Sequence, residues 1–366
     1  MRLPLSFVNT TPLRADRVIV LTPKMGGADG ISEMTRQWVH VLQPKAGRDF
    51  GFLHVWSLDD ERLPASTPST TFRTASGNRS RFVSFGFLDG FASAPNTVVI
   101  AMHLQLLPVA LPLVWRGARL IPVLMGIEAW TPLPSLVTMA FQRSWKVAAI
   151  SNHTVTRFRT ANPLLVDMPI TVCRPGLPLL PQPAADARTD DFALIVGRMC
   201  SRERYKGHDA LIDVWPLVRE VVPGARLVIA GDGDDTARLR GKAGAGIEFT
   251  GRVDEAKLAG LYRDAAFFVM PSTDEGFGLV YLEAMRASTP CIAARGAAEE
   301  IITDGRDGLI VDAENRDALV AAIVRLFLDR QGRQQMGTAA AQRVEREFGP
   351  IAVERRICTV LELGDA

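Results

Sequence analysis

The chain has 366 residues, of which 47% are hydrophobic and 22% are charged. These values fit a globular protein long enough for two domains, each with its own core. No apolar run reaches the roughly 18 to 20 residues that span a bilayer, and the first residues lack the apolar core of a secretory signal. The four cysteines are scattered without a C-x-x-C pair, which favours reduced thiols over a disulfide framework or a zinc site. We therefore expect a cytoplasmic protein.

Charge is distributed unevenly along the chain. Residues 1–180 contain 18 Lys and Arg against 10 Asp and Glu, whereas the remainder contains 24 against 30. A basic half can bind an anionic lipid surface, a diphosphate or nucleic acid. Because the sequence has no Lys/Arg tract and no basic–aromatic repeat, we expect no nucleic-acid partner. Peripheral association with the inner face of a membrane stays open.

The first half alternates apolar runs of strand length with helical patterns, which predicts a parallel α/β sheet. Strands are expected at residues 17–23, 50–58, 97–102, 118–126, 146–151 and 170–175. The Pro-, Ser- and Thr-rich stretch 64–78 is expected to be the least ordered part. Segment 104–115 is followed by Arg116 and Arg119. It is either a core helix kinked at its prolines or an apolar patch on a membrane surface, and the core interpretation is favoured.

Two features of the first half could contact a ligand. A glycine-rich loop at residues 24–30 leads into a helix at 31–42. Its spacing matches neither G-x-G-x-x-G nor a P-loop, so an ordinary turn is the simpler interpretation. His103 lies at the C-terminal end of a predicted strand, where open α/β sheets bind ligands. A lone histidine there is still more often a hydrogen-bonded structural residue.

The second half repeats the alternation of strands and helices after a proline-rich stretch at 177–191, which is a hinge by composition. Strands are expected at residues 191–198, 227–232, 247–250, 265–270 and 290–295, and helices at 254–264, 315–328, 333–347 and 350–363. Arg198 ends the first of these strands and Lys206 precedes the next helix. Two cations at one crevice suit a pyrophosphate, although two solvated surface charges are the simpler interpretation without further context.

The sequence PSTDEGFGLVYLEAM, residues 271–285, follows a continuous apolar run and is the centre of the second half. Glycines at a strand-to-helix turn let the backbone approach a ligand, and free amides at a helix start attract phosphate. Glu275 and Glu283 could accept hydrogen bonds from vicinal hydroxyls. If the helix begins near Gly276, eight helical steps place the two side chains about 80° apart, on one side of a cleft. An ordinary βα turn with one solvated and one helix-supporting glutamate remains the alternative.

These motifs together resemble one known family. Glu275-x7-Glu283 is preceded by PS and followed by EAM-x4-P, and Arg198 and Lys206 lie in VGR-x7-KG. The sequence GIEAW at 126–130 is similar to a G-x-E-x-W segment found beside the acceptor site of that family. The chain thus resembles the retaining glycosyltransferases of family four, also called glycosyltransferase group 1. The resemblance is clear over about 191–328 and looser over 17–176.

The resemblance implies the α/β fold named GT-B, in which two Rossmann-like domains face each other across an interdomain cleft. Residues 1–180 would then form the acceptor domain, and residues 181–349 the nucleotide-sugar donor domain. The last helix, about 350–366, would pack back onto the first domain. Relatives commonly carry Gly-Gly-x-x-Glu where this chain has Gly296-Ala297-Ala298-Glu299-Glu300, a mild departure.

The resemblance also implies roles for individual residues. Arg198 and Lys206 would neutralise the leaving diphosphate, so that no metal and no other cofactor is required. Glu283 would bind the ribose hydroxyls and Glu275 the donor sugar. The catalytic set is Arg198, Lys206, Glu275 and His103. The expected donor site also contains Gly27, Val253, Gly276, Phe277, Gly278, Leu279 and Glu283, and the acceptor side contains His103 and Glu128.

The implied function is retaining transfer of a hexose from a nucleoside diphosphate sugar to a glycan or lipid-linked saccharide. Bacterial polysaccharide or cell-envelope glycan synthesis would be its setting. Three other functions compete. An NAD-dependent dehydrogenase would use similar sheets, but no predicted strand is followed by G-x-G-x-x-G. A sugar-nucleotide epimerase or a non-catalytic nucleotide-sugar-binding protein would retain the two cations. The sequence specifies neither the base nor the sugar of the donor.

Overall fold

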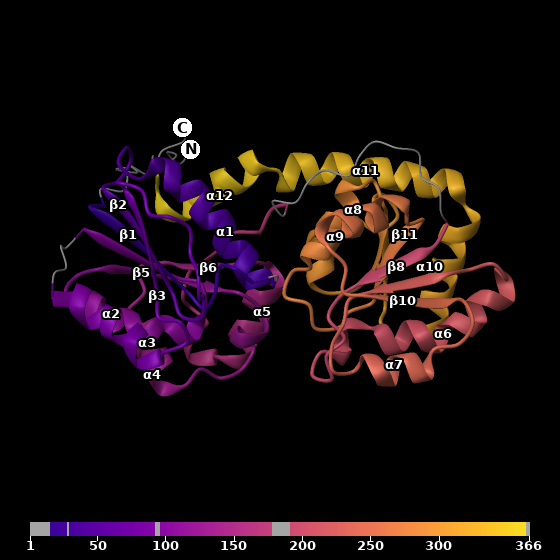
Figure 1. Ribbon diagram of the computed structural model, residues 1–366, viewed down its shortest axis with the longest axis horizontal. Helices are drawn as coiled ribbons and strands as arrows, with labels where there is room; N and C mark the ends of the chain where they lie inside the picture. Colours follow the sequence, from indigo (N-terminus) through magenta and orange to yellow (C-terminus); the bar gives the residue numbers. More distant parts are fainter. Residues whose placement is uncertain (1–14, 28, 92–95, 178–190, 364–366) are drawn as a thin grey trace, which may run out of the picture. The chain divides into compact units, whose positions relative to one another are not determined.

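The computed structural model describes residues 15–27, 29–91, 96–177 and 191–363 (Figure 1). These residues divide into two compact units. The first contains residues up to 150, residues 154–174 and the C-terminal segment from 351. The second contains residues 151–153 and 175–350. Most of the predicted hinge at 177–191 lies outside the described residues.

The first unit is built on a seven-stranded sheet in the order β3-β2-β1-β4-β5-β6-β7. The strands are β1 (Arg17–Thr22), β2 (Phe52–Ser57), β3 (Thr70–Thr74), β4 (Thr97–Ala101), β5 (Arg119–Leu124), β6 (Val147–Ala149) and β7 (Ile170–Val172). All neighbouring strands are parallel. The central strands β1 and β4 are almost entirely buried, as continuous apolar runs require when helices cover both faces of a sheet.

The helices of the first unit connect these strands. They are α1 (Gly30–Leu42), α2 (Arg79–Phe91), α3 (Leu107–Trp115), α4 (Ser135–Phe141) and α5 (Asn152–Ala161), with α12 (Pro350–Leu361) at the C-terminal end. Lys45 is 2% exposed, and its Nζ lies 2.7 Å from Glu354 Oε1 of α12. Lys146 Nζ donates to the carbonyl of Val360 at 3.2 Å. These two lysines fasten α12 to the unit.

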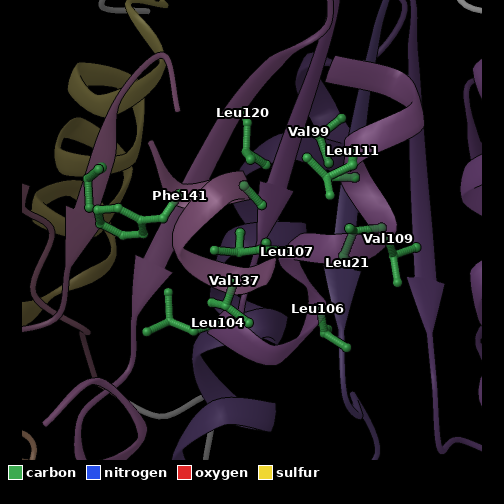
Figure 2. Packing of buried hydrophobic residues seen from close by; sticks show 14 of the residues in the cluster. Leu21, Val99, Leu104, Leu106, Leu107, Val109, Leu111, Leu120, Val137 and Phe141 are labelled. Carbon is green, nitrogen blue, oxygen red and sulfur yellow. The ribbon is translucent and has the colours of Figure 1, made fainter. Parts of the chain in front are cut away.

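The apolar segment after β4 is part of the core. Figure 2 shows Leu107 and Leu111 of α3 packed among side chains of the sheet and of α4. Apolar side chains from Leu104 to Leu113 are buried, which confirms the core interpretation for that stretch. At its end Trp115 is 61% exposed, and Arg116 is also exposed. The guanidinium of Arg119 lies 4.7 Å from the ring centre of Trp145.

The second unit has a six-stranded parallel sheet in the order β10-β9-β8-β11-β12-β13. Its strands are β8 (Ala193–Val196), β9 (Leu227–Ala230), β10 (Ile247–Gly251), β11 (Phe267–Met270), β12 (Cys291–Ala294) and β13 (Gly308–Val311). Its helices are α6 (His208–Val221), α7 (Thr236–Lys242), α8 (Glu255–Asp264), α9 (Leu279–Arg286), α10 (Arg316–Leu328) and α11 (Arg330–Phe348). The α/β prediction is confirmed in both units.

The stretch 64–78 is more ordered than its composition indicated. Residues 70–74 form β3, which pairs with β2 along five residues, from Leu53 opposite Thr70 to Ser57 opposite Thr74. Thr70 is fully buried. The prediction that this stretch is the least ordered part was therefore wrong for residues 70–74, because pairing with a buried neighbouring strand orders a polar, threonine-rich edge strand. None of the described helices combines the length and the apolar character needed to cross a bilayer.

Candidate active site

Each sheet has one point at which the strand order reverses. In the second unit the reversal lies between β8 and β11, which pair through Ala193 with Phe267 and Leu194 with Phe268. In the first unit it lies between β1 and β4. The loops that leave the carboxyl ends of two such strands run in opposite directions, which opens a crevice that α/β proteins use for ligands. Arg198 follows β8 and Glu275 follows β11, so both belong to this crevice in the second unit.

The structure brings Arg198 and Lys206 to a single carboxylate, that of Glu203. Arg198 Nη2 lies 2.5 Å from Glu203 Oε1, and Lys206 Nζ lies 3.5 Å from Glu203 Oε2. The Arg198 side chain is 62% exposed, whereas Lys206 is 16% exposed and Glu203 17% exposed. Two cations therefore converge on one anion at the carboxyl end of β8.

The backbone around Lys206 explains its position. Residues Arg204–Lys206 form a single 3-10 turn that ends at Gly207, and α6 begins directly after it. Gly207 has φ of 86°, a left-handed conformation that favours glycine, and a Cβ there would lie 2.7 Å from Pro271 Cγ. The turn thus packs against the end of β11. A Cβ on Gly197 would lie 3.5 Å from Lys206 Cδ, so the lysine side chain packs over the glycine that follows β8.

Glu275 shares the electrostatic environment of these groups. Burial raises the pKa of the Glu275 carboxyl, the positive charge of Lys206 opposes that rise, and the carboxylate of Glu203 adds to it. Burial also raises the pKa of the Tyr205 hydroxyl, and both Glu203 and Glu275 raise it further. Two carboxylates and two cations therefore interact within one crevice.

The turn between β11 and α9 is tightly constrained. Gly278 has φ of 100° and is the residue before α9. The hydroxyl of Tyr281 donates to the carbonyl of Met270 at 2.7 Å, which fixes α9 against β11. Phe277 is 3% exposed and its ring lies 6.0 Å from that of Phe348, so its side chain packs in the core. Of Phe277, only the backbone amide remains a candidate contact for a ligand.

The prediction that Glu275 and Glu283 lie on one side of a cleft assumed the wrong first residue for the helix. The helix α9 begins at Leu279 and not near Gly276, because the left-handed conformation at Gly278 interrupts the helical path. Glu275 therefore lies in the turn and Glu283 on the helix, and the estimated 80° between them does not apply. Glu283 is half-buried, and its Oε2 accepts a hydrogen bond of 2.6 Å from the hydroxyl of Tyr262.

The aspartates after β9 serve their own turn. Asp232 Oδ1 accepts hydrogen bonds from the amide of Gly233 and the hydroxyl of Thr236, both at 2.9 Å. Asp234 accepts from the amide and hydroxyl of Ser201. These hydrogen bonds hold the pKa of both carboxyls below their ordinary value. Among the described residues, no group of three or more His, Cys, Asp or Glu side chains is arranged to hold a metal ion.

Two further predicted positions lie near the ends of β10 and β12. Val253 is partly exposed and follows β10. After β12, Gly296 has φ of 124° and its amide donates to Glu299 Oε2 at 2.9 Å. Ala297 is 3% exposed. Alanine in place of the second glycine is thus accommodated in the interior of that turn.

In the first unit, the glycine loop after β1 is held from two sides. The carboxylate of Asp60, itself 2% exposed, accepts from the amides of Met25 at 2.6 Å and Gly26 at 2.9 Å. Arg36 Nη1 donates to the carbonyl of Gly27 at 2.8 Å and also to that of Met25. A Cβ on Gly27 would lie 2.4 Å from the hydroxyl of Ser32, so only glycine fits without a shift.

His103 and Glu128 follow the neighbouring strands β4 and β5. His103 Nδ1 accepts from the amide of Gln105 at 3.2 Å, and burial lowers the pKa of its imidazole, which is therefore neutral at pH 7. Glu128 Oε1 accepts from the amide of Met125 at 2.6 Å, and burial raises the pKa of its carboxyl to about 7. Since β1, β4 and β5 are adjacent, Gly27, His103 and Glu128 lie along one edge of the first sheet.

The second unit matches a known family. Residues 191–329 match the model of the glycosyl transferases group 1. Over these residues the chain is similar to the group 1 glycosyltransferases. Over 209 residues it is 32% identical to a phosphatidyl-myo-inositol mannosyltransferase of Mycobacterium leprae, a match that covers 56% of this chain and 52% of that protein.

Another relative matches in sequence, and solved structures match in fold. A GDP-mannose-dependent monoacylated alpha-(1-6)-phosphatidylinositol monomannoside mannosyltransferase of Corynebacterium glutamicum is 30% identical over 235 residues, 58% of this chain and 61% of that protein. The chain thus spans between half and two thirds of the length of these relatives.

A sucrose-phosphate synthase from Thermosynechococcus elongatus has a TM-score of 0.74 at 20% identity, covering 94% of this chain and 98% of that chain. Anabaena Alr3699/HepE in complex with UDP and glucose has a TM-score of 0.73 at 17% identity, covering 94% and 99%. These structural likenesses show that the chain has the two-domain GT-B fold.

Three residues that shape the candidate site were missed from the sequence. Glu203 lies in the charged run between Arg198 and Lys206, and that charge alternation was the available signal. Tyr262 contacts Glu283 from a different helix, so no local spacing indicates the pair. Asp60 reaches the glycine loop from beyond β2, which is likewise a tertiary contact.

A glycine substitution tests how tightly the β11–α9 turn is built. In Gly278→Ala the new Cβ would lie 2.5 Å from Tyr281 Cδ2, at a φ that L side chains rarely adopt. We expect the free energy of unfolding to fall by about 2 kcal/mol, because the left-handed conformation alone costs roughly 1–2 kcal/mol. Urea denaturation measures this change. Gly241→Ala is the matched control, since that glycine lies in α7 with open space around it and alanine should add up to about 1 kcal/mol. Equal stability of Gly278→Ala and Gly241→Ala would contradict the prediction that alanine at residue 278 strains the turn.

Proposed function

We propose that this chain is a retaining glycosyltransferase that moves a hexose from a nucleoside diphosphate sugar to a glycan or lipid-linked saccharide. The observation that carries the proposal is the convergence of Arg198 and Lys206 on the Glu203 carboxylate, beside Glu275, at the point where the strand order reverses. A place that already holds one anion between two cations suits the diphosphate of a donor.

The two cations have a defined task in this reaction. The bond between the sugar anomeric carbon and the β-phosphate oxygen breaks, and its electron pair goes to that oxygen. Arg198 and Lys206 neutralise the negative charge that develops there, which lowers the barrier. The acceptor oxygen bonds to the anomeric carbon on the same face, and its proton passes to the departing phosphate. No protein nucleophile and no metal ion is needed for this sequence.

Other residues position the two substrates. Glu283 accepts from the ribose hydroxyls, and Glu275 accepts from hydroxyls of the donor sugar. The backbone amides from Phe277 to Leu279, at the start of α9, bind the phosphate. Val253 lies beside the base.

The first unit binds the acceptor. Because Nδ1 accepts from the amide of Gln105, the neutral imidazole of His103 carries its proton on Nε2 and can donate a hydrogen bond to a hydroxyl. Glu128, with its pKa of about 7, can do the same in its protonated form. Of the relatives above, one is named for GDP-mannose and both for phosphatidylinositol mannoside chemistry. We therefore propose GDP-mannose as the first donor to test and a phosphatidylinositol-type lipid as the first acceptor.

Product analysis separates this proposal from its competitors. With GDP-mannose and a lipid acceptor, a glycosyltransferase yields GDP and a mannosylated lipid, whose anomeric configuration by NMR should match that of the donor. An epimerase would convert the sugar nucleotide without an acceptor. A non-catalytic binding protein would bind the nucleotide and release no GDP.

The contribution of the cation pair can be measured in Lys206→Ala. We expect the donor KM to rise and kcat to fall, with kcat/KM reduced roughly 30- to 1000-fold, because one charge-assisted contact to the leaving group is lost. Lys242→Ala is the control, since that lysine pairs with Asp209 and Asp213 on the surface of the same unit. A wild-type kcat/KM in Lys206→Ala would remove Lys206 from the diphosphate site.

Metal independence is tested with a chelator. Because two cations carry the charge of the leaving group, EDTA should leave the initial rate within about twofold of the untreated enzyme. The control is a re-addition series of Mg²⁺ and Mn²⁺. Loss of activity in EDTA with recovery in either metal would assign the leaving-group charge to a bound cation.

We also propose that the first unit associates with an anionic membrane surface. The neighbouring helices α2, α3 and α4 (Figure 1) carry exposed apolar side chains. Phe87 is 52% exposed, Leu88 65%, Trp115 61% and Leu136 52%. Arg79 and Arg81 of α2 and Arg116 after α3 are exposed as well. Apolar side chains together with arginines are the combination that binds an anionic interface.

Vesicle co-sedimentation tests the membrane proposal. Each arginine near an anionic surface contributes about 1 kcal/mol, and salt screens that attraction. We expect binding to phosphatidylglycerol vesicles but not to phosphatidylcholine vesicles, with loss of binding at high salt and in the triple charge reversal Arg79→Glu, Arg81→Glu and Arg116→Glu. Arg306→Glu, an exposed arginine of the second unit, is the control. Equal indifference to both vesicle types at low ionic strength would exclude the association.

A further inference from the structure

Tyr262 is a buried tyrosine whose hydroxyl reaches the candidate site. Its side chain is 3% exposed, and its ring centre lies 5.9 Å from that of Phe268 in β11. Its carbonyl accepts a hydrogen bond of 2.6 Å from the hydroxyl of Thr289. The hydroxyl of Tyr262 donates to Glu283 Oε2, also at 2.6 Å. Backbone and ring are therefore fixed while the hydroxyl is directed at one carboxylate oxygen.

This contact restricts both the orientation and the chemistry of Glu283. A glutamate on a half-buried helix face otherwise samples several rotamers, and ordering it costs conformational entropy when a ligand binds. A fixed hydroxyl at hydrogen-bond distance selects one of these rotamers before binding. Burial and the nearby Glu283 raise the pKa of the Tyr262 hydroxyl, which therefore remains a donor. The acceptor of that hydrogen bond is the Oε2 atom of Glu283.

We propose that Tyr262 is a positioning residue for ribose recognition, which holds the Glu283 carboxylate in the orientation that accepts hydrogen bonds from the ribose hydroxyls of a nucleoside diphosphate. This inference rests on the proposed function, which assigns Glu283 to the ribose. It deepens that function, because it makes the preference for ribose over deoxyribose depend on a residue that does not touch the ligand. The tyrosine acts through the glutamate alone.

The structure offers a matched control for a merely structural role. Tyr281 is another fully buried tyrosine of the same unit, and its hydroxyl donates to the carbonyl of Met270 at 2.7 Å. Tyr281→Phe and Tyr262→Phe each remove one buried hydroxyl and keep the ring. If the hydroxyls only stabilise the fold, the two variants should behave alike toward nucleotides.

The experiment measures dissociation constants by calorimetry for GDP and UDP and for their 2′-deoxy and 3′-deoxy analogues. We expect the wild type to prefer at least one ribonucleotide to its deoxy analogues by about tenfold or more, the range for one hydrogen bond to a charged group. Tyr262→Phe should lose most of that preference while its affinity for the deoxy analogues stays within about twofold. Tyr281→Phe should keep the wild-type preference.

A double-mutant cycle with Glu283→Gln keeps the test decisive even if Tyr262→Phe is less stable. Glu283→Gln alone should abolish the ribose preference, and Tyr262→Phe should have no further effect on it in that background. An unchanged preference in Tyr262→Phe, or an equal loss of affinity for ribo- and deoxynucleotides, would overturn the inference. If the wild type binds no nucleotide at all, the proposed function fails and the inference fails with it.

Discussion

The parallel pairing of β8 with β11 is the constraint on which the candidate site depends. Only two residue pairs define its register, yet it places the loops after both strands at the same crevice. Arg198 and Lys206 come from one loop, and Glu275 comes from the other. Because connections between parallel strands must be long and right-handed, the two loops diverge from this point and leave it open. In the first unit the strand order reverses between β1 and β4, so the glycine loop after β1 and His103 after β4 lie at the same edge of that sheet.

The charges in that crevice are balanced before any ligand arrives. The carboxylates of Glu203 and Glu275 reduce the electrostatic repulsion between Arg198 and Lys206, which lets the two cations lie close together. A diphosphate that binds there competes with Glu203 for both cations. Replacement of the Glu203 carboxylate by the diphosphate is favourable where several phosphate oxygens contact the cations, since each of these oxygens adds charge-assisted hydrogen bonds. Under the proposed function, Glu203 would take the place of the diphosphate and keep the two cations oriented.

The fold was largely predictable because its central strands are continuous apolar runs between helical patterns. The exceptions are elements whose stability comes from neighbours: β3 is polar and is ordered by pairing with β2, and β13 is a short strand that begins at Gly308. The glycine-containing turn after β11 was predictable, but the first residue of the following helix, Leu279, was not. That start depends on the left-handed conformation at Gly278, which is set by local packing. Tyr262 was not predictable, since residues on separate helices meet only through the tertiary fold.

The two cations are not equivalent, and their exposure explains the division between them. Lys206 is mostly buried and its side chain packs over Gly197, so its charge acts through a medium of lower effective dielectric and its position is set by packing. Arg198 is mostly exposed, and an exposed ion pair such as the one it makes with Glu203 contributes little to stability. In the proposed reaction, Arg198 would therefore leave Glu203 at small cost and follow the phosphate as the bond to the sugar breaks. In the proposed reaction, a lysine fixed by packing binds the phosphate and an adaptable arginine follows the developing charge. This division would stabilise the transition state more than the ground state, which is the condition for catalysis.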